Sequence, residues 1–180
     1  MPQIFPEGQL KFSFPDGWQI CRLEKTSFYI RHFQNFCDIF GGVGGCKEMD
    51  FLAYDPFTSV LWMIEVKDYR AQQRTKPIEL IDEIALKVRD SLALLRVAPV
   101  RDMAVGDGHL QARAFALASS QATNIRVVLH CEIPQQPSRL FPGVKDSANL
   151  QHKMNTRLRQ IDPHSLVTNS ASNKVPWSVI

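Results

Sequence analysis

Two short β-type runs in the first half of the chain form its clearest hydrophobic pattern. Residues 48–54 and 59–67 are rich in apolar side chains, and the segment 55–58 (DPFT) between them opens with Asp-Pro, which initiates turns. This pattern predicts a β-hairpin. A third run, residues 124–133, is apolar and β-branched, which is typical of a buried strand.

Helical spacing of apolar residues follows the hairpin. Pro77 opens a predicted helix, and its apolar positions recur every three or four residues until Pro99 ends the pattern. Residues 110–120 also have helical composition. Asp146 can cap a polar helix that runs to about residue 160. After the hairpin, the chain is therefore expected to form two helices, the buried strand and a further helix.

The remaining segments have weaker patterns. Residues 1–15 contain three prolines and predict an irregular N-terminal arm. Residues 18–36 are ambiguous between helix and strand, and we interpret them as mostly helix. Residues 164–168 are expected to add a short last strand. The order of elements predicts one α/β domain over residues 1–180, with a mixed central β-sheet flanked by α-helices.

Composition is that of an ordinary globular domain. The chain has 180 residues, 44% of them hydrophobic and 22% charged, and a formal net charge of +3. This charge permits a polyanionic partner but does not require one. No signal-like start and no apolar run near eighteen residues are present, so we expect a soluble, cytoplasmic protein without a membrane partner.

Cysteines and glycines indicate no further chemistry. The four cysteines are scattered without a C-x-x-C pair, so we interpret them as reduced packing residues rather than as zinc ligands. The glycine-rich segment 41–45 is followed by Cys46, Lys47 and Glu48, which does not fit the G-x-x-x-x-G-K-[ST] pattern of a phosphate-binding loop. No serine has a G-x-S-x-G setting.

Three charged residues of the hairpin are expected to share one face of the sheet. If residues 55–58 form the turn, Asp50 faces Met63 and lies diagonal to Glu65, with Lys67 two residues further along. Any loop of even length keeps this parity. The same parity places Glu48 opposite Glu65, where we interpret it as a rim charge rather than an extra ligand.

These residue types suit a hard metal ion. The carboxylates of Asp50 and Glu65, with a backbone carbonyl from Val66, would offer the oxygen ligands that Mg²⁺ or Mn²⁺ prefers. Such an ion neutralises a phosphoryl oxygen and generates hydroxide, and the ammonium of Lys67 can orient that water or stabilise developing charge. The alternative is an exposed, ion-paired hairpin with no ligand.

Asp50, followed after fourteen residues by the Glu65-Val66-Lys67 tripeptide, resembles the motif of the PD-(D/E)XK nuclease superfamily, which includes restriction endonucleases and Holliday-junction resolvases. The resemblance implies a restriction-endonuclease-like fold and metal-dependent hydrolysis of nucleic-acid phosphodiesters. It also implies Asp50 and Glu65 as metal ligands and Lys67 as the catalytic aid. Many members carry a further acidic residue in the first element, for which Glu24 is the candidate, although a surface glutamate explains it equally well.

Four basic residues are candidate phosphate contacts. Lys47, Arg70, Lys153 and Arg157 are the candidates for nucleic-acid binding, and Lys153 and Arg157 are i,i+4 neighbours on the predicted last helix. A solvated helix face is the alternative for that pair. His130, in an apolar strand, is interpreted as a core histidine.

Two functions from different classes remain open at this stage. The first is a Mg²⁺-dependent endonuclease, with DNA favoured over RNA, in phage defence, restriction or repair. The second is a binding or scaffolding subunit with a nuclease-like fold and no cleavage activity of its own. Either would act with nucleic acid and with a homodimer mate or a larger ATPase- or helicase-type partner.

Overall fold

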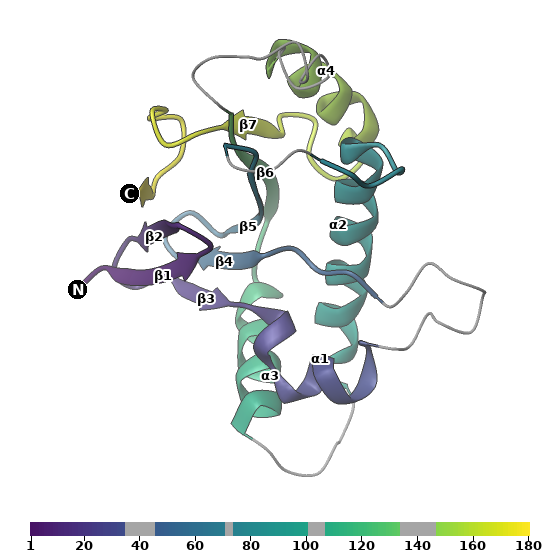
Figure 1. Ribbon diagram of the computed structural model, residues 1–180. Helices are drawn as coiled ribbons and strands as arrows, with labels where there is room; N and C mark the ends of the chain where they lie inside the picture. The colour runs from purple at the N-terminus through teal and green to yellow at the C-terminus, as the bar shows by residue number, and fades with distance from the viewer. Residues whose placement is uncertain (35–45, 71–73, 101–106, 134–146) are drawn as a thin grey trace.

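The protein is described by a computed structural model that covers residues 1–34, 46–70, 74–100, 107–133 and 147–180 (Figure 1). Its strands and helices follow one another in the order β1 (Gln3–Glu7), β2 (Leu10–Phe14), β3 (Gln19–Cys21), α1 (Ser27–His32), β4 (Phe51–Asp55), β5 (Val60–Asp68), α2 (Leu80–Val97), α3 (Asp107–Ser119), β6 (Asn124–Glu132), α4 (Ser147–Leu158), β7 (Leu166–Thr168) and β8 (Ser178–Val179).

The central sheet has five strands in the order β3-β4-β5-β6-β7. Strands β3, β4 and β5 pair antiparallel, whereas β5, β6 and β7 pair parallel. Strand β5 is therefore the middle strand, with an antiparallel neighbour on one side and a parallel neighbour on the other. The α/β class and the mixed sheet predicted from the sequence are confirmed.

All four helices in the described part of the chain lie on one side of this sheet (Figure 1). Side chains such as Leu52, Met63 and Leu129 point toward them and form a core with the buried faces of α2, α3 and α4. The helical pattern of α2 explains its place there, because Ile84, Val88 and other apolar residues on one stripe are buried.

The opposite face of the central sheet is covered by strands rather than helices. Strands β1, β2 and β8 form a small antiparallel sheet, and Phe12 and Phe14 of β2 pack with Phe51 of β4. The sequence prediction of helices around the sheet was thus correct for one face only.

The prediction of an irregular arm over residues 1–15 was wrong, because β1 and β2 form a hairpin there. Gly8, at φ 57°, occupies the two-residue turn between them, a conformation that glycine adopts without a steric penalty. Pro6 is tolerated because β1 is an edge strand, whose outer side needs no N–H donor. The prolines therefore mark an edge strand and not the absence of one.

The hairpin formed by β4 and β5 was predicted correctly, but its register is shifted. Tyr54 lies opposite Leu61, and Leu52 opposite Met63, whereas the sequence pattern predicted Asp50 opposite Met63. Asp55 explains the shift: it extends β4 into the proposed turn, and its carboxylate accepts hydrogen bonds from the backbone N–H groups of Phe57 and Thr58. The side-chain parity is unchanged.

Other predictions had mixed outcomes. Residues 18–36 begin with strand β3 before α1, so the assignment of mostly helix was wrong for the first residues. The helix after Pro77 and the strands near residues 124–133 and 164–168 are confirmed. Cys37, the glycine-rich segment 41–45 and the capping residue Asp146 lie outside the described residues. Across the described ranges, no helix combines the length and the apolar character needed to cross a membrane.

Replacing Phe12 tests whether the N-terminal hairpin belongs to the core. The Phe12→Ala variant should lose about 3–5 kcal/mol of unfolding free energy, because a fully buried ring is removed from between two sheets. Urea denaturation measures this loss. Ile4→Ala, at an exposed position of the same hairpin, is the control and should stay within about 0.5 kcal/mol of the parent. Equal, small effects at both positions would contradict the packing of this hairpin.

Candidate active site

The site is built where β4 begins beside the second half of β5. Phe51 pairs with Ile64, so continuing the register by one residue sets Asp50 across from Glu65. Both side chains then point to the helical side of the sheet, which Leu52 and Met63 also face. The backbone N–H of Val66 donates to Oδ2 of Asp50 at 2.7 Å, which fixes this carboxylate against β5.

An ammonium group from α2 joins the two carboxylates. Lys87 Nζ lies 2.8 Å from a carboxylate oxygen of Glu65 and 3.3 Å from Oδ1 of Asp50. Lys67, two residues beyond Glu65 on β5, also donates to the Glu65 carboxylate. Asp50 and Glu65 therefore converge on one cation, as the parity of the hairpin predicted, and two lysines face two carboxylates.

Burial controls the electrostatics of this cluster. Glu65 has 0% exposure, and this burial, together with the neighbouring Asp50 carboxylate, raises the pKa of Glu65 against the opposing effect of Lys87 and Lys67. Burial also acts to lower the pKa of Lys87, but the carboxylates of Glu65 and Asp50 outweigh it and raise that pKa above its ordinary value. Lys87 therefore stays charged beside them.

Helix α2 presents a polar stripe to this end of the sheet. Ser91 accepts a hydrogen bond from the backbone N–H of Met49 at 2.9 Å, and Asp90 accepts one from the N–H of Lys47 at 3.1 Å. These contacts hold the segment that leads into β4. Because Lys87 lies one turn before Ser91 on the same stripe, the helix positions Asp50 and supplies its counter-ion together.

Lys87 is the site residue that the sequence argument missed. Reading α2 by its apolar positions alone hid the polar residues that share its inner face. The usable signal was the spacing of Glu83, Lys87 and Ser91, four residues apart, because these positions follow the same stripe as the buried Ile84 and Val88. A polar residue at a core-facing helical position needs a buried partner.

Glu48 differs from its predicted place. It is buried, not a rim charge, and it lies before the start of β4, near Tyr29 and Lys87. Burial raises the pKa of Glu48 to about 7, although the Tyr29 hydroxyl and the Lys87 ammonium act in the opposite direction. One of its carboxylate oxygens is buried and has no hydrogen-bond partner among the described residues.

Two predicted metal ligands have other contacts. Glu24 lies in a short 3₁₀ turn and pairs with Arg22 at 2.8 Å, so its carboxylate is already engaged at the edge of the cluster. Val66 contributes its N–H to Asp50, and a ligand role for its carbonyl stays a prediction.

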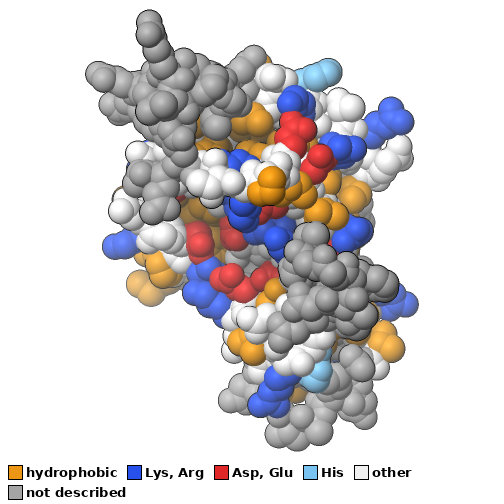
Figure 2. Space-filling model, turned by 45° about the vertical axis from the view of Figure 1, so that its right-hand side comes forward, with side chains coloured by type: hydrophobic (Ala, Val, Ile, Leu, Met, Phe, Trp, Pro, Cys, Tyr) orange, Lys and Arg blue, Asp and Glu red, His pale blue; other side chains and the backbone are white. Residues whose placement is uncertain are grey.

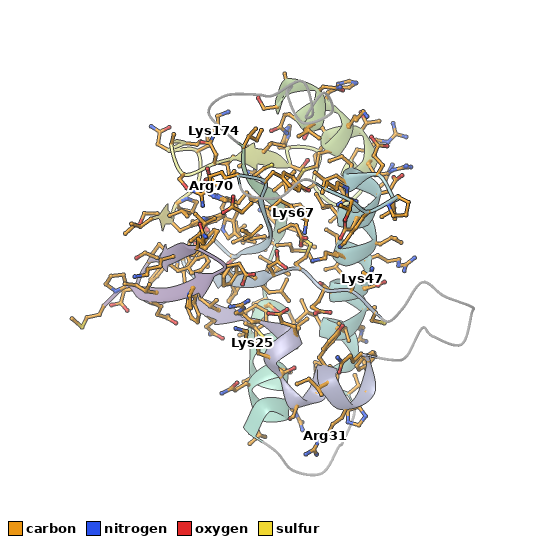
Figure 3. The ribbon with its side chains drawn as sticks, in the orientation of Figure 1. Lys25, Arg31, Lys47, Lys67, Arg70 and Lys174 are labelled. Carbon is orange, nitrogen blue, oxygen red and sulfur yellow. The ribbon has the colours of Figure 1, made fainter. Side chains whose placement is uncertain are left out.

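The candidate phosphate contacts are separated into two regions. Lys47 and Arg70 lie on either side of Lys67 in the view of Figure 3, and Arg70 pairs with Asp68. Lys153 and Arg157, on α4, instead pair with Glu79 and Asp82 near the start of α2. That pair of side chains thus joins α4 to α2, and binding of nucleic acid by any of these four residues remains a prediction.

One face of the molecule carries both signs of charge. Lys and Arg side chains intermix with Asp and Glu side chains near the middle of the face shown in Figure 2. Glu83 of α2 is itself buried and receives hydrogen bonds from Lys76 and from Arg74. The mixed charge leaves no broad single-sign patch on this view.

His130 and three cysteines of the described residues have structural places. His130 is buried in β6, and its Nε2 lies 2.9 Å from Oε1 of Glu132, as expected for a core histidine. Cys21 and Cys131 are buried in the core and Cys46 packs against it, in agreement with the predicted packing role. Within the described ranges, no three His, Cys, Asp or Glu side chains are grouped to hold a metal ion. Two carboxylates nevertheless fit Mg²⁺, which usually keeps several waters.

Comparison with known proteins gives a partial similarity. The chain is similar to a cysteine–tRNA ligase from Neisseria meningitidis serogroup A, with 27% identity over an alignment 211 residues long. The alignment covers 96% of this chain but only 29% of the ligase, so the chain spans less than a third of that relative. No protein-family model matches the chain, and no solved structure matches it.

The free energy of unfolding should depend on pH through the buried Glu83 carboxylate of α2. Burial raises the pKa of Glu83, but hydrogen bonds from Lys76 and Arg74 outweigh burial and lower it to about 2. A carboxyl with a lowered folded-state pKa stabilises the fold above its unfolded pKa, and this contribution is lost as the pH falls toward the folded value. The window therefore runs from about pH 4.5 down to about pH 2.

Glu83→Gln should therefore cost about 2 kcal/mol of unfolding free energy near neutral pH and progressively less in acid. Urea denaturation of both proteins across this pH window gives the difference. Glu79→Gln, which removes an exposed carboxyl close by, is the matched control and should show no such trend. A Glu83→Gln difference that stays constant with pH would contradict the assignment of the lowered pKa.

Proposed function

We propose that the protein is a metal-dependent nuclease that hydrolyses nucleic-acid phosphodiester bonds. The observation that carries this proposal is the convergence of Asp50 and Glu65, from adjacent strands, on a single cationic group. Two carboxylates close enough to share an ammonium are close enough to share a divalent ion of the size of Mg²⁺ or Mn²⁺. The resemblance to PD-(D/E)XK nucleases rests on these same residues.

Asp50 and Glu65 would hold the ion, with water completing its shell. When bound, the metal supplies charge neutralisation for the scissile phosphate and an activated water. The chain's own residues then have distinct tasks. Val66 orients Asp50 through its backbone N–H, and the ammonium of Lys67 neutralises Glu65 and is placed to stabilise negative charge that develops on the phosphate.

DNA is the substrate we favour, with a role in phage defence, restriction or repair, in the cytoplasm, and with a homodimer mate or a larger ATPase- or helicase-type partner. The partial similarity to a protein whose name refers to tRNA is a reason to include RNA among the substrates tested.

A second candidate function has its own supporting observation. Lys87 and Lys67 compensate the charges of Asp50 and Glu65 without any metal. A scaffolding or binding subunit with a nuclease-like fold could use this ion-paired cluster simply to join α2 to the hairpin. Cleavage assays separate the two candidates.

The nuclease proposal is tested by incubating the protein with plasmid DNA, oligonucleotides and RNA in Mg²⁺, Mn²⁺ or EDTA. Cleavage should require the metal, and Asp50→Asn and Glu65→Gln should abolish it because each removes a metal-binding charge. Lys67→Ala should lower the rate by about 100-fold or more. Asp16→Asn, which changes an exposed carboxylate in the turn before β3, is the control and should cleave at the parent rate.

Cleavage that persists in EDTA, or in the Asp50→Asn and Glu65→Gln proteins, would reject the proposed site. Binding of nucleic acid without cleavage under every metal condition would favour the scaffolding function.

A further inference from the structure

We propose that Lys87 is a positioning residue whose ammonium occupies the place of the divalent ion in the metal-free protein and leaves it when the ion binds. This inference rests on the proposed function, since it concerns the same two carboxylates, but it assigns a role to a residue outside the nuclease-like motif. It begins from the position of Lys87 Nζ between Asp50 and Glu65.

Lys87 occupies the position that a shared ion would need. Lys87 Nζ contacts one oxygen from each carboxylate, at 3.3 Å from Asp50 and 2.8 Å from Glu65. An ion shared by Asp50 and Glu65 has to lie between the same two carboxylates, where coordination distances near 2 Å leave no room for an ammonium. Metal and ammonium therefore compete for one position.

The charges of the cluster also favour displacement of one lysine. The cluster contains two carboxylates and two ammonium groups, so it is neutral when all four are ionised. Adding a divalent ion while both lysines stay in place would leave a net charge of two in a buried site, which is unfavourable in a low dielectric. Withdrawal of one ammonium reduces that excess, and a phosphate group of the substrate would compensate the remainder.

The contacts of the two lysines indicate which one moves. Lys67 extends from β5 directly beside Glu65 and contacts Glu65, but has no contact with Asp50 among the described interactions. Lys87 reaches the site from α2 along a flexible four-carbon side chain, and its ammonium contacts both carboxylates, between which the ion would bind. Lys67 can stay next to the metal, whereas Lys87 has to turn away from Asp50.

The role of Lys87 before metal binds follows from the burial of Glu65. Without an ammonium, the carboxylates of Asp50 and Glu65 would face each other and repel. Lys87 holds them in a shared position, so the site is assembled before the ion arrives. Its presence stabilises the metal-free fold and weakens the affinity for the ion.

Lys87→Met tests both effects, on the stability of the metal-free fold and on the affinity for the ion, because it keeps much of the length of the side chain and removes its charge. Isothermal titration with Mn²⁺ alone at pH 8 should give at least ~10-fold tighter binding than in the parent protein. In EDTA the variant should melt at a lower temperature than the parent, and saturating Mn²⁺ should restore a larger part of its stability.

Lys76→Met is the matched control. It also removes an ammonium from a buried carboxylate of the α2 region, that of Glu83, but does not touch Asp50 or Glu65. Its Mn²⁺ affinity should equal that of the parent. Unchanged or weaker Mn²⁺ binding by Lys87→Met, with Lys76→Met behaving like the parent, would overturn the proposed displacement.

A measurement on the parent protein keeps the inference testable if Lys87→Met does not fold. Trace acetylation followed by mass spectrometry reports the reactivity of each lysine amine. Mn²⁺ should raise the reactivity of Lys87 relative to Lys76 by at least ~3-fold, because its ammonium is released from its contacts with the carboxylates of Asp50 and Glu65 and becomes accessible to the reagent. If Mn²⁺ binds and the acetylation reactivity of Lys87 does not change, the inference is overturned.

The outcomes also separate this inference from the proposed function. If the parent binds Mn²⁺ and cleaves nucleic acid but Lys87→Met shows no gain in affinity, only the displacement is rejected. If neither the parent nor Lys87→Met binds Mn²⁺, both the nuclease function and the displacement are rejected.

Discussion

The burial of the Glu65 carboxylate is the constraint on which the arrangement around the site depends. A carboxylate with 0% exposure is costly unless cations or hydrogen-bond donors compensate it, and here Lys67 and Lys87 supply that compensation. Lys67 comes from the same strand, but Lys87 comes from α2. Helix α2 must therefore pass close to the end of β5 for Glu65 to be buried at all.

The same helix then fixes the second carboxylate. Ser91 and Asp90 accept the backbone N–H groups of Met49 and Lys47, and the segment that carries Asp50 is held against α2 before β4 begins. The N–H of Val66 completes the placement from the other side. Packing, strand register and the ion pairs thus constrain the position of Asp50 independently.

The local parts of this arrangement were predictable from sequence, whereas the long-range parts were not. Parity within a hairpin depends only on the period of a strand, so the shared face of Asp50, Glu65 and Lys67 followed even though the register was shifted by the turn at Asp55. Contacts of Lys87 depend on how α2 crosses the sheet, which no local spacing specifies.

Two predictions from weak local sequence signals were wrong because tertiary packing determines the structure at those positions. Three prolines suggested an irregular arm, yet the first residues form a hairpin because its side chains Phe12 and Phe14 find a core against Phe51. Glu48 looked like a rim charge because a glutamate is usually exposed, but the approach of the segment to α2 buries it. In both cases burial by a distant element outweighed the local preference.

The charge cluster itself bears on the choice between nuclease and scaffold. Buried ion pairs contribute little net stability, and apolar side chains of similar volume would join α2 to the hairpin as well or better. A subunit that needed only this junction would have no physical requirement for two carboxylates that repel each other and two lysines that compensate them. Holding the carboxylates of Asp50 and Glu65 side by side is energetically unfavourable, and a site that binds a metal cation needs this arrangement. We therefore favour catalysis over scaffolding as the role of the cluster.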